Sequence, residues 1–167
     1  MRSWECLKVS YQMTQDALFK QMSEGLQSLY EQFYMEMYRS GLPFELNEVL
    51  RTRETQEAYY AQGRLKLSEV NRLRKLAGLW SISDAENSYQ VTWTKNSRHF
   101  ADANGKSNAF DIRLLKYGKP HWQTKWDGNK NSIPDYVEAA RIGHQIGLEA
   151  GGLWEKPDFP HFQLRST

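Results

Sequence analysis

Two histidines and two aspartates in the second half of the chain have side-chain types and spacings suited to a metal ion and a proton transfer. Asp111 lies in an apolar, strand-like run, and His99 precedes it in a polar segment. Asp158 stands shortly before His161 in a turn that contains a proline. A carboxylate inside an apolar strand needs a partner, because leaving it buried and unpaired costs several kcal/mol. Coordination to a cation would remove that cost.

The chemistry that this set favours is metal-assisted hydrolysis. Two imidazoles, one carboxylate and an open fourth position are typical of a catalytic zinc site, where the pKa of the bound water falls to about 7. Asp158 is close in sequence to one imidazole and could accept the proton of that water without being a ligand. From the residues alone, Asp158 could equally cap a turn and His161 could lie on the surface.

The pattern of apolar residues predicts an α+β fold to position these groups. Apolar side chains recur every three or four residues from Thr14 to Tyr38, which predicts a long N-terminal amphipathic helix that ends before Pro43. Further helices are expected over 52–62, over 68–76 with Ser68 as the cap, and over 135–148. Strands are expected over 44–50, 89–94, 109–115 and 161–164, and loops over 101–108 and 118–131. We expect a single domain over 1–167, with its motif-bearing core at about 44–164 and a small, mostly antiparallel sheet flanked by helices.

Three short motifs resemble those of the M15 zinc peptidases, in particular the branch of phage endolysins and L-alanyl-D-glutamate endopeptidases. The Ser-x-His, Ala-x-Asp and acidic-x-x-His motifs of that family read here as Ser97-Arg98-His99, Ala109-Phe110-Asp111 and Asp158-Phe159-Pro160-His161. Arg51-Thr52 with Gln56, the run Tyr60 to Arg64, and Gly151-Gly152-Leu153-Trp154 extend the likeness to about 50–164.

The resemblance implies a role for each matched residue. His99, Asp111 and His161 would bind one Zn²⁺ per chain, Asp158 would be the general base, and Arg51 would stabilise the developing oxyanion. Arg53 competes for the last role, but the spacing to Gln56 favours Arg51.

Three further residues are candidates for substrate binding: Ser97 and Gln56 from the motifs, and Trp154 because it lies close to Asp158 in sequence. His121 and His144 have no motif around them and are not expected to be ligands. The chain departs from the family in a longer separation of His99 and Asp111, with an extra loop over 101–106, and in a long segment over 65–90.

The same resemblance implies an activity. We expect a zinc-dependent peptidase that hydrolyses a bond in the stem peptide of peptidoglycan, with L-Ala–D-Glu as the first expectation, acting as a monomeric phage or prophage endolysin in host cell lysis. Two alternatives stay open: a D-Ala-type carboxypeptidase of the same family, and a non-catalytic module that binds the cell envelope or belongs to a phage structure.

Composition excludes several other classes. The net charge is only +2, from 22 basic and 20 acidic residues that are mixed along the chain, so nucleic acid is not an expected partner. Cys6 is the only cysteine, which rules out an internal disulfide and a thiolate-rich metal site. No apolar run is long enough to span a membrane, so stable membrane insertion is not expected. Because residues 1–8 lack the apolar run of a secretion signal, we expect cytoplasmic synthesis and action in the periplasm or cell wall after release.

Overall fold

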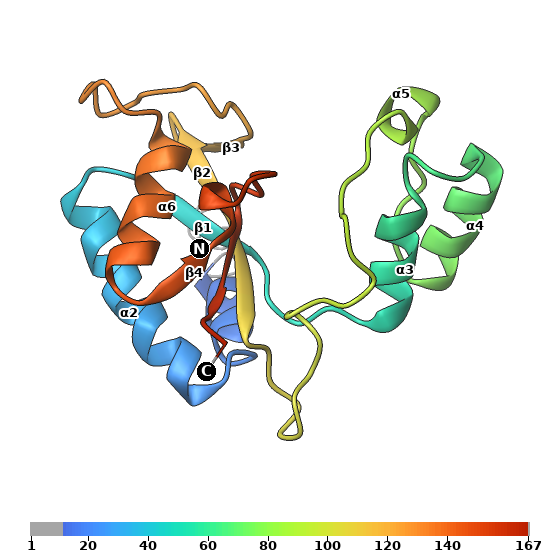
Figure 1. The fold of residues 1–167 in the computed structure, drawn as a ribbon, viewed down its shortest axis with the longest axis horizontal. Helices are drawn as coiled ribbons and strands as arrows, with labels where there is room; N and C mark the ends of the chain where they lie inside the picture. The colour runs from blue at the N-terminus through green and yellow to red at the C-terminus, as the bar shows by residue number, and fades with distance from the viewer. Residues whose placement is uncertain (1–11, 167) are drawn as a thin grey trace, which may run out of the picture. The chain divides into compact units, whose positions relative to one another are not determined.

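The computed structural model describes residues 12–166, so the expectations about residues 1–8 and Cys6 lie outside the described residues. The fold is the predicted mixture of helices with a small antiparallel sheet (Figure 1). By its packing the chain divides into two compact units, the first made of residues up to 50 and from 102 onward, and the second of Arg51–Ala101. The single domain over 1–167 stays a prediction. Among residues 12–166, no helix is long and apolar enough to cross a membrane.

The first unit is built on a five-stranded antiparallel sheet. Its strands run in the order β1-β2-β5-β4, and β3 also pairs with β2. Their bounds are β1 Phe44–Glu48, β2 Ala109–Lys116, β3 Lys119–His121, β4 Leu148–Ala150 and β5 His161–Leu164. Two helices, α2 Glu24–Arg39 and α6 Asp135–Gln145, pack together with the sheet, and a 3-10 turn, η1 Gly151–Leu153, follows β4 (Figure 1).

Aromatic side chains form the centre of this unit's core. Phe110 of β2 and Phe162 of β5 are opposite each other in the ladder and stack with ring centroids 5.3 Å apart. Phe33 of α2 packs on Phe162 at 4.7 Å. A Cβ on Gly143 of α6 would lie 2.6 Å from the Phe162 ring, so only glycine lets α6 approach the sheet this closely. All three phenylalanines are fully buried, and the opposite faces of β2 and β5 are thereby available for polar side chains.

The predicted N-terminal helix is divided in two. Residues 12–19 are helical, but the chain then turns and α2 begins only at Glu24. Between the two helices Met22 forms a β-bridge with Ser107, and backbone hydrogen bonds join Gln21 and Ser23 to the same serine. The prediction of one uninterrupted helix over 14–38 is therefore wrong at 20–23. Apolar periodicity continues across the break because Met22 and Leu26 are both buried in the same core.

The second unit is helical. It contains α3 Arg53–Ala61, α4 Leu67–Leu76 and the short α5 Asp84–Asn87, which the sequence did not predict. Thr52 caps α3, its hydroxyl accepting the backbone N–H of Thr55 at 3.1 Å. The residue before α4 is Lys66, so Ser68 is the second residue of that helix and not its cap.

Three other predicted elements differ from the structure. The loop expected over 118–131 contains the short strand β3, which pairs with β2. No strand forms over 89–94. The backbone carbonyls of this segment accept hydrogen bonds from side chains of α3 and of the turn that follows α3. Gln56 donates to the carbonyl of Thr94 at 2.6 Å, and Arg64 donates to the carbonyl of Thr92 at 3.0 Å. The last predicted helix ends at Gln145 and not near 148. Gly147, at φ +107°, turns the chain into β4.

Candidate metal centre

Strand pairing brings Asp111 and His161 together. Asp111 of β2 and His161 of β5 are directly opposite in the antiparallel ladder, where side chains on one face lie about 5 Å apart at Cβ. They extend from the face opposite the stacked Phe110 and Phe162, because successive side chains alternate along a strand. Nδ1 of His161 lies 3.1 Å from Oδ1 of Asp111. The two side chains are only 8% and 13% exposed, so this polar pair is largely removed from water.

A tight turn places Asp158 beside His161. The N–H of Asp158 donates to the carbonyl of Gly151 at 2.9 Å, and the N–H of His161 donates to the carbonyl of Asp158 at 3.2 Å. A Cβ on Gly151 would lie 2.5 Å from that same Asp158 carbonyl and 3.1 Å from Cβ of His161. Glycine is therefore required at this position for the turn to close over η1.

The second ring nitrogen of His161 is held by a chain of hydrogen bonds that crosses the sheet. Nε2 of His161 lies 2.9 Å from Oε1 of Gln163, and Nε2 of Gln163 donates to Glu149 at 3.0 Å. The indole N–H of Trp154 donates to the other oxygen of Glu149 at 3.1 Å. This arrangement follows from the ladder, because Gln163 lies two residues after His161 on the same face and is paired with Glu149 of β4.

This chain of bonds determines which nitrogen of His161 carries a proton. A carboxylate only accepts, so Glu149 directs the NH₂ of Gln163 toward itself and the amide oxygen toward His161. Nε2 of His161 must then donate to that oxygen. Nδ1 of the neutral ring is left with a lone pair that faces an oxygen of Asp111.

Two facing acceptors require a cation between them. A proton on Nδ1 can be that cation, and the pKa of His161 is shifted in the direction that favours this proton. Burial lowers the pKa, but the hydrogen bond and charge of Asp111, aided by Gln163 and the charge of Asp158, outweigh burial and raise it above the usual value. A metal ion serves the same purpose, and outer partners that fix the ring are typical of metal-binding histidines.

His99 is buried in the second unit, with 1% of its surface exposed. Its backbone N–H donates to the hydroxyl of Ser97 at 3.2 Å, and its carbonyl accepts from the backbone N–H of Arg51 at 3.0 Å. The Arg51 guanidinium donates to Oε1 of Gln56 at 2.8 Å, and it lies over the Tyr59 ring at 5.1 Å. Ser97 and Gln56 therefore hold the backbone of His99 and the side chain of Arg51, and a role for them in substrate binding stays a prediction.

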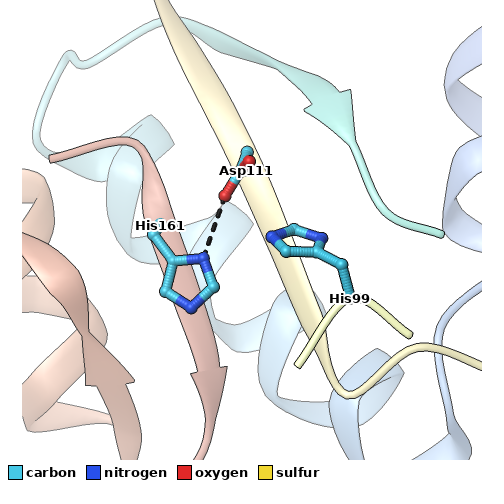
Figure 2. A group of neighbouring side chains, drawn as sticks. All are labelled: His99, Asp111 and His161. Atoms are coloured by element: carbon cyan, nitrogen blue, oxygen red, sulfur yellow. Dashed lines mark hydrogen bonds and ion pairs between the residues drawn. The ribbon is translucent and has the colours of Figure 1, made fainter. Parts of the chain in front are cut away.

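His99, Asp111 and His161 together form a group that could hold a metal ion. One possible ligand atom from each lies within 4.8 Å of the others, and Figure 2 shows the three side chains next to one another. Within residues 12–166 this is the only such group of three or more histidine, cysteine or acidic side chains. Two nitrogens and one oxygen suit zinc, and the facing acceptors of His161 and Asp111 fit a cation. The three predicted ligands are thus brought together.

The remaining predicted residues have the following positions. Asp158 is half-buried and close enough for its charge to act on His161. The Trp154 ring lies 5.3 Å from the His161 ring and is 37% exposed, so it offers a surface to a ligand. Arg53 lies in the first turn of α3, and its guanidinium stacks over the Phe100 ring at 4.8 Å from the ring centroid. Gln163 and Glu149 were not predicted, although a polar residue two positions after a ligand in a strand was a usable signal.

Comparison with known proteins gives a likeness in fold. No protein-family model and no curated protein matches the sequence. Among solved structures, the chain is similar to the Serratia marcescens L-Ala D-Glu endopeptidase ChiX, with a TM-score of 0.51 and 23% identity. The match covers 90% of this chain and 86% of that protein. At this level of identity the likeness shows that the chain shares the fold of that endopeptidase.

Proposed function

We propose that the chain is a zinc-dependent peptidase that cleaves the stem peptide of peptidoglycan. The observation that carries the proposal is the buried group of His99, Asp111 and His161, with ligand atoms within 4.8 Å. The fold supports it, because a solved structure with this fold is an L-Ala D-Glu endopeptidase. The motifs that resemble M15 peptidases fall on the same three residues.

The donor set favours zinc over magnesium and calcium. Imidazole nitrogens with a single carboxylate suit zinc, whereas magnesium and calcium prefer sites made of oxygens. Manganese or cobalt could also accept this set, so measured metal content decides the identity. When bound, zinc supplies a Lewis acid and lowers the pKa of a water molecule.

The chain's own residues would carry the proton and the charge. Asp158 would accept the proton of the attacking water and return it to the leaving amine, and it is close enough for its charge to act on His161. Arg51, held by Gln56, would stabilise the developing oxyanion, since a fixed guanidinium needs no reorganisation during the reaction. The exposed part of Trp154 would contact substrate beside His161.

We further propose the L-Ala–D-Glu bond as the scissile bond and a lytic role, as a monomeric phage or prophage endolysin that acts in the periplasm or cell wall after release. The name of the structural neighbour supports the bond. The resemblance of the sequence motifs to phage endolysins supports the role.

Mass spectrometry of purified muropeptides tests the proposal. The zinc-loaded protein is expected to release a fragment that begins at D-Glu and to leave L-Ala on the muramic acid, with complete inhibition by a chelator. Release of terminal D-Ala alone would show that the chain is a carboxypeptidase and not an endopeptidase. Unchanged muropeptides with a fully zinc-loaded protein would refute the enzyme and favour an envelope-binding module.

A further inference from the structure

The segment before α6 carries a second set of oxygen ligands, well separated in sequence from His99, Asp111 and His161. Residues 127–138 read Asp-Gly-Asn-Lys-Asn-Ser-Ile-Pro-Asp-Tyr-Val-Glu. The twelve-residue calcium loop of EF-hands takes side-chain oxygens from positions 1, 3, 5, 9 and 12 and a backbone carbonyl from position 7. Here those positions are Asp127, Asn129, Asn131, Asp135 and Glu138, with Ile133 at position 7.

The match is a spacing of ligand types and not merely a group of acids. Every side-chain ligand position has an oxygen-bearing residue, and position 12 has the glutamate that binds calcium through both oxygens. One position departs from the pattern, because Ser132 stands where the loop has glycine. The backbone there has φ +71°, the left-handed conformation for which glycine is used in that loop.

In the structure the loop is folded around the ligand positions. The carboxylate of Asp127 accepts the N–H groups of Asn131 at 3.2 Å and Ser132 at 2.8 Å. The amides of Asn129 and Asn131 both donate to the same oxygen of Glu138, at 2.9 and 2.8 Å. Side chains from positions 3, 5 and 12 therefore meet at one point. Rotation of each amide by a half-turn would direct its oxygen to that point, in exchange for the backbone N–H groups of Asn131 and Ile133 that these oxygens now accept.

In the part of the chain that the structure describes, the acids of this loop are not ion-paired, although the loop itself contains Lys130. Among residues 12–166, Asp127, Asp135 and Glu138 have no lysine or arginine within ion-pair distance. Asp135 is 5% exposed, and its carboxylate accepts the backbone N–H of Gly128 at 2.8 Å.

We propose that residues 127–138 bind a calcium ion. Asp127, Asn129, Asn131 and the carbonyl of Ile133 would each give one oxygen, and Glu138 would give two. These six oxygens are within the range of six to eight that calcium takes, and Asp135 would act through a water at position 9. Because only two ligands are charged, we expect weak binding, with Kd about 10⁻⁵ to 10⁻³ M.

The ion would fasten the start of α6 to the loop before it. Glu138 lies in the first turn of α6, and Asp127 lies in the loop that precedes the helix. Asp135 is the first residue of α6, and Tyr136, the next, is buried in the core. Calcium binding would therefore stabilise the folded chain by mass action, in proportion to occupancy.

Calcium titration of the full-length, zinc-saturated protein tests the proposal, because saturation with zinc prevents calcium from reporting on the histidine site. Calorimetry is expected to show one saturable calcium site, with much weaker binding of magnesium at equal concentration. Terbium, a luminescent substitute for calcium, should be sensitised by Trp126, whose Nε1 would lie 2.8 Å from a Cβ on Gly128. Trp126→Phe should reduce this emission while calcium still displaces terbium.

Conservative variants give the matched comparison. Glu138→Gln and Asp127→Asn are expected to weaken calcium binding about tenfold or more, because each removes a charged ligand. Asp102→Asn is the control: Asp102 also accepts two backbone N–H groups in a tight loop, from Asn104 and Lys106, without the calcium spacing. Absence of saturable calcium binding by the folded wild type, or equal binding by Glu138→Gln and wild type, would overturn the proposal.

Discussion

Replacing Gln163 by leucine is expected to weaken zinc binding without unfolding the chain. Gln163 is 7% exposed and is the partner that holds Nε2 of His161, so that the lone pair of Nδ1 faces Asp111. Removing such an outer partner costs about ten- to hundredfold in metal affinity, or about 1.4 to 2.7 kcal/mol. A second estimate of this loss agrees. Without Gln163 the buried Nε2–H of His161 has no acceptor, and a buried donor left without a partner costs about 1 to 3 kcal/mol.

The assay is a competition for zinc between the protein and a coloured chelator at neutral pH. Gln27→Leu is the matched control, because Gln27 is also partly buried in the first unit and donates to two backbone carbonyls, those of Phe19 and Met22. Glu149→Gln is expected to fall between wild type and Gln163→Leu. This substitution keeps the shape of the side chain at 149. An amide can donate as well as accept, however, so it no longer fixes which end of the Gln163 amide faces His161. Zinc affinity in folded Gln163→Leu equal to that of Gln27→Leu would show that Gln163 does not orient His161 for the metal.

Three further outcomes are expected. Phe162→Ala should lower the free energy of unfolding by about 3 to 5 kcal/mol in urea denaturation, because the ring is fully buried against two others; a loss below about 1 kcal/mol would contradict the core described here. Gly151→Ala should reduce both stability and zinc affinity, since its Cβ would strike the carbonyl of Asp158; a variant with unchanged thermal midpoint and affinity would disprove the requirement for glycine. The raised pKa of His161 implies that protonation favours the metal-free fold. That contribution to the free energy of unfolding is fully present below about pH 6.5 and is lost as pH rises through the raised pKa. In urea denaturation, the stability of the metal-free wild type should therefore fall with pH across this range relative to His161→Gln. Parallel pH profiles of the two proteins would show that His161 makes no such contribution.

The candidate ligands could be predicted from sequence because their pattern is local. Asp111 in an apolar strand and His161 at the start of another are each visible in a few residues. The register that makes them direct neighbours is a property of the β2–β5 pairing and is not encoded by either strand alone. For the same reason Gln163 was visible as a neighbour of His161, but the orienting role of Glu149 required the β4–β5 register.

The incorrect elements have a common physical cause, which is competition from tertiary contacts. Residues 89–94 have the composition of a strand, but without an adjacent strand their carbonyls bond to Gln56 and Arg64. Met22 fits a helical period and yet forms a bridge with Ser107. The ligand spacing of 127–138 is present in the sequence. It was not predicted as a site, because Ser132 stands where the calcium loop has glycine.

The most direct test of the proposed function compares muropeptide cleavage by wild type and Asp158→Ala, with zinc content measured in the same samples. About one zinc per chain is expected in both proteins, with cleavage by the wild type and loss of cleavage in the variant, because Asp158 would move the proton without holding the metal. Undiminished cleavage by zinc-loaded Asp158→Ala, or a wild type that binds no zinc and still cleaves, would contradict it.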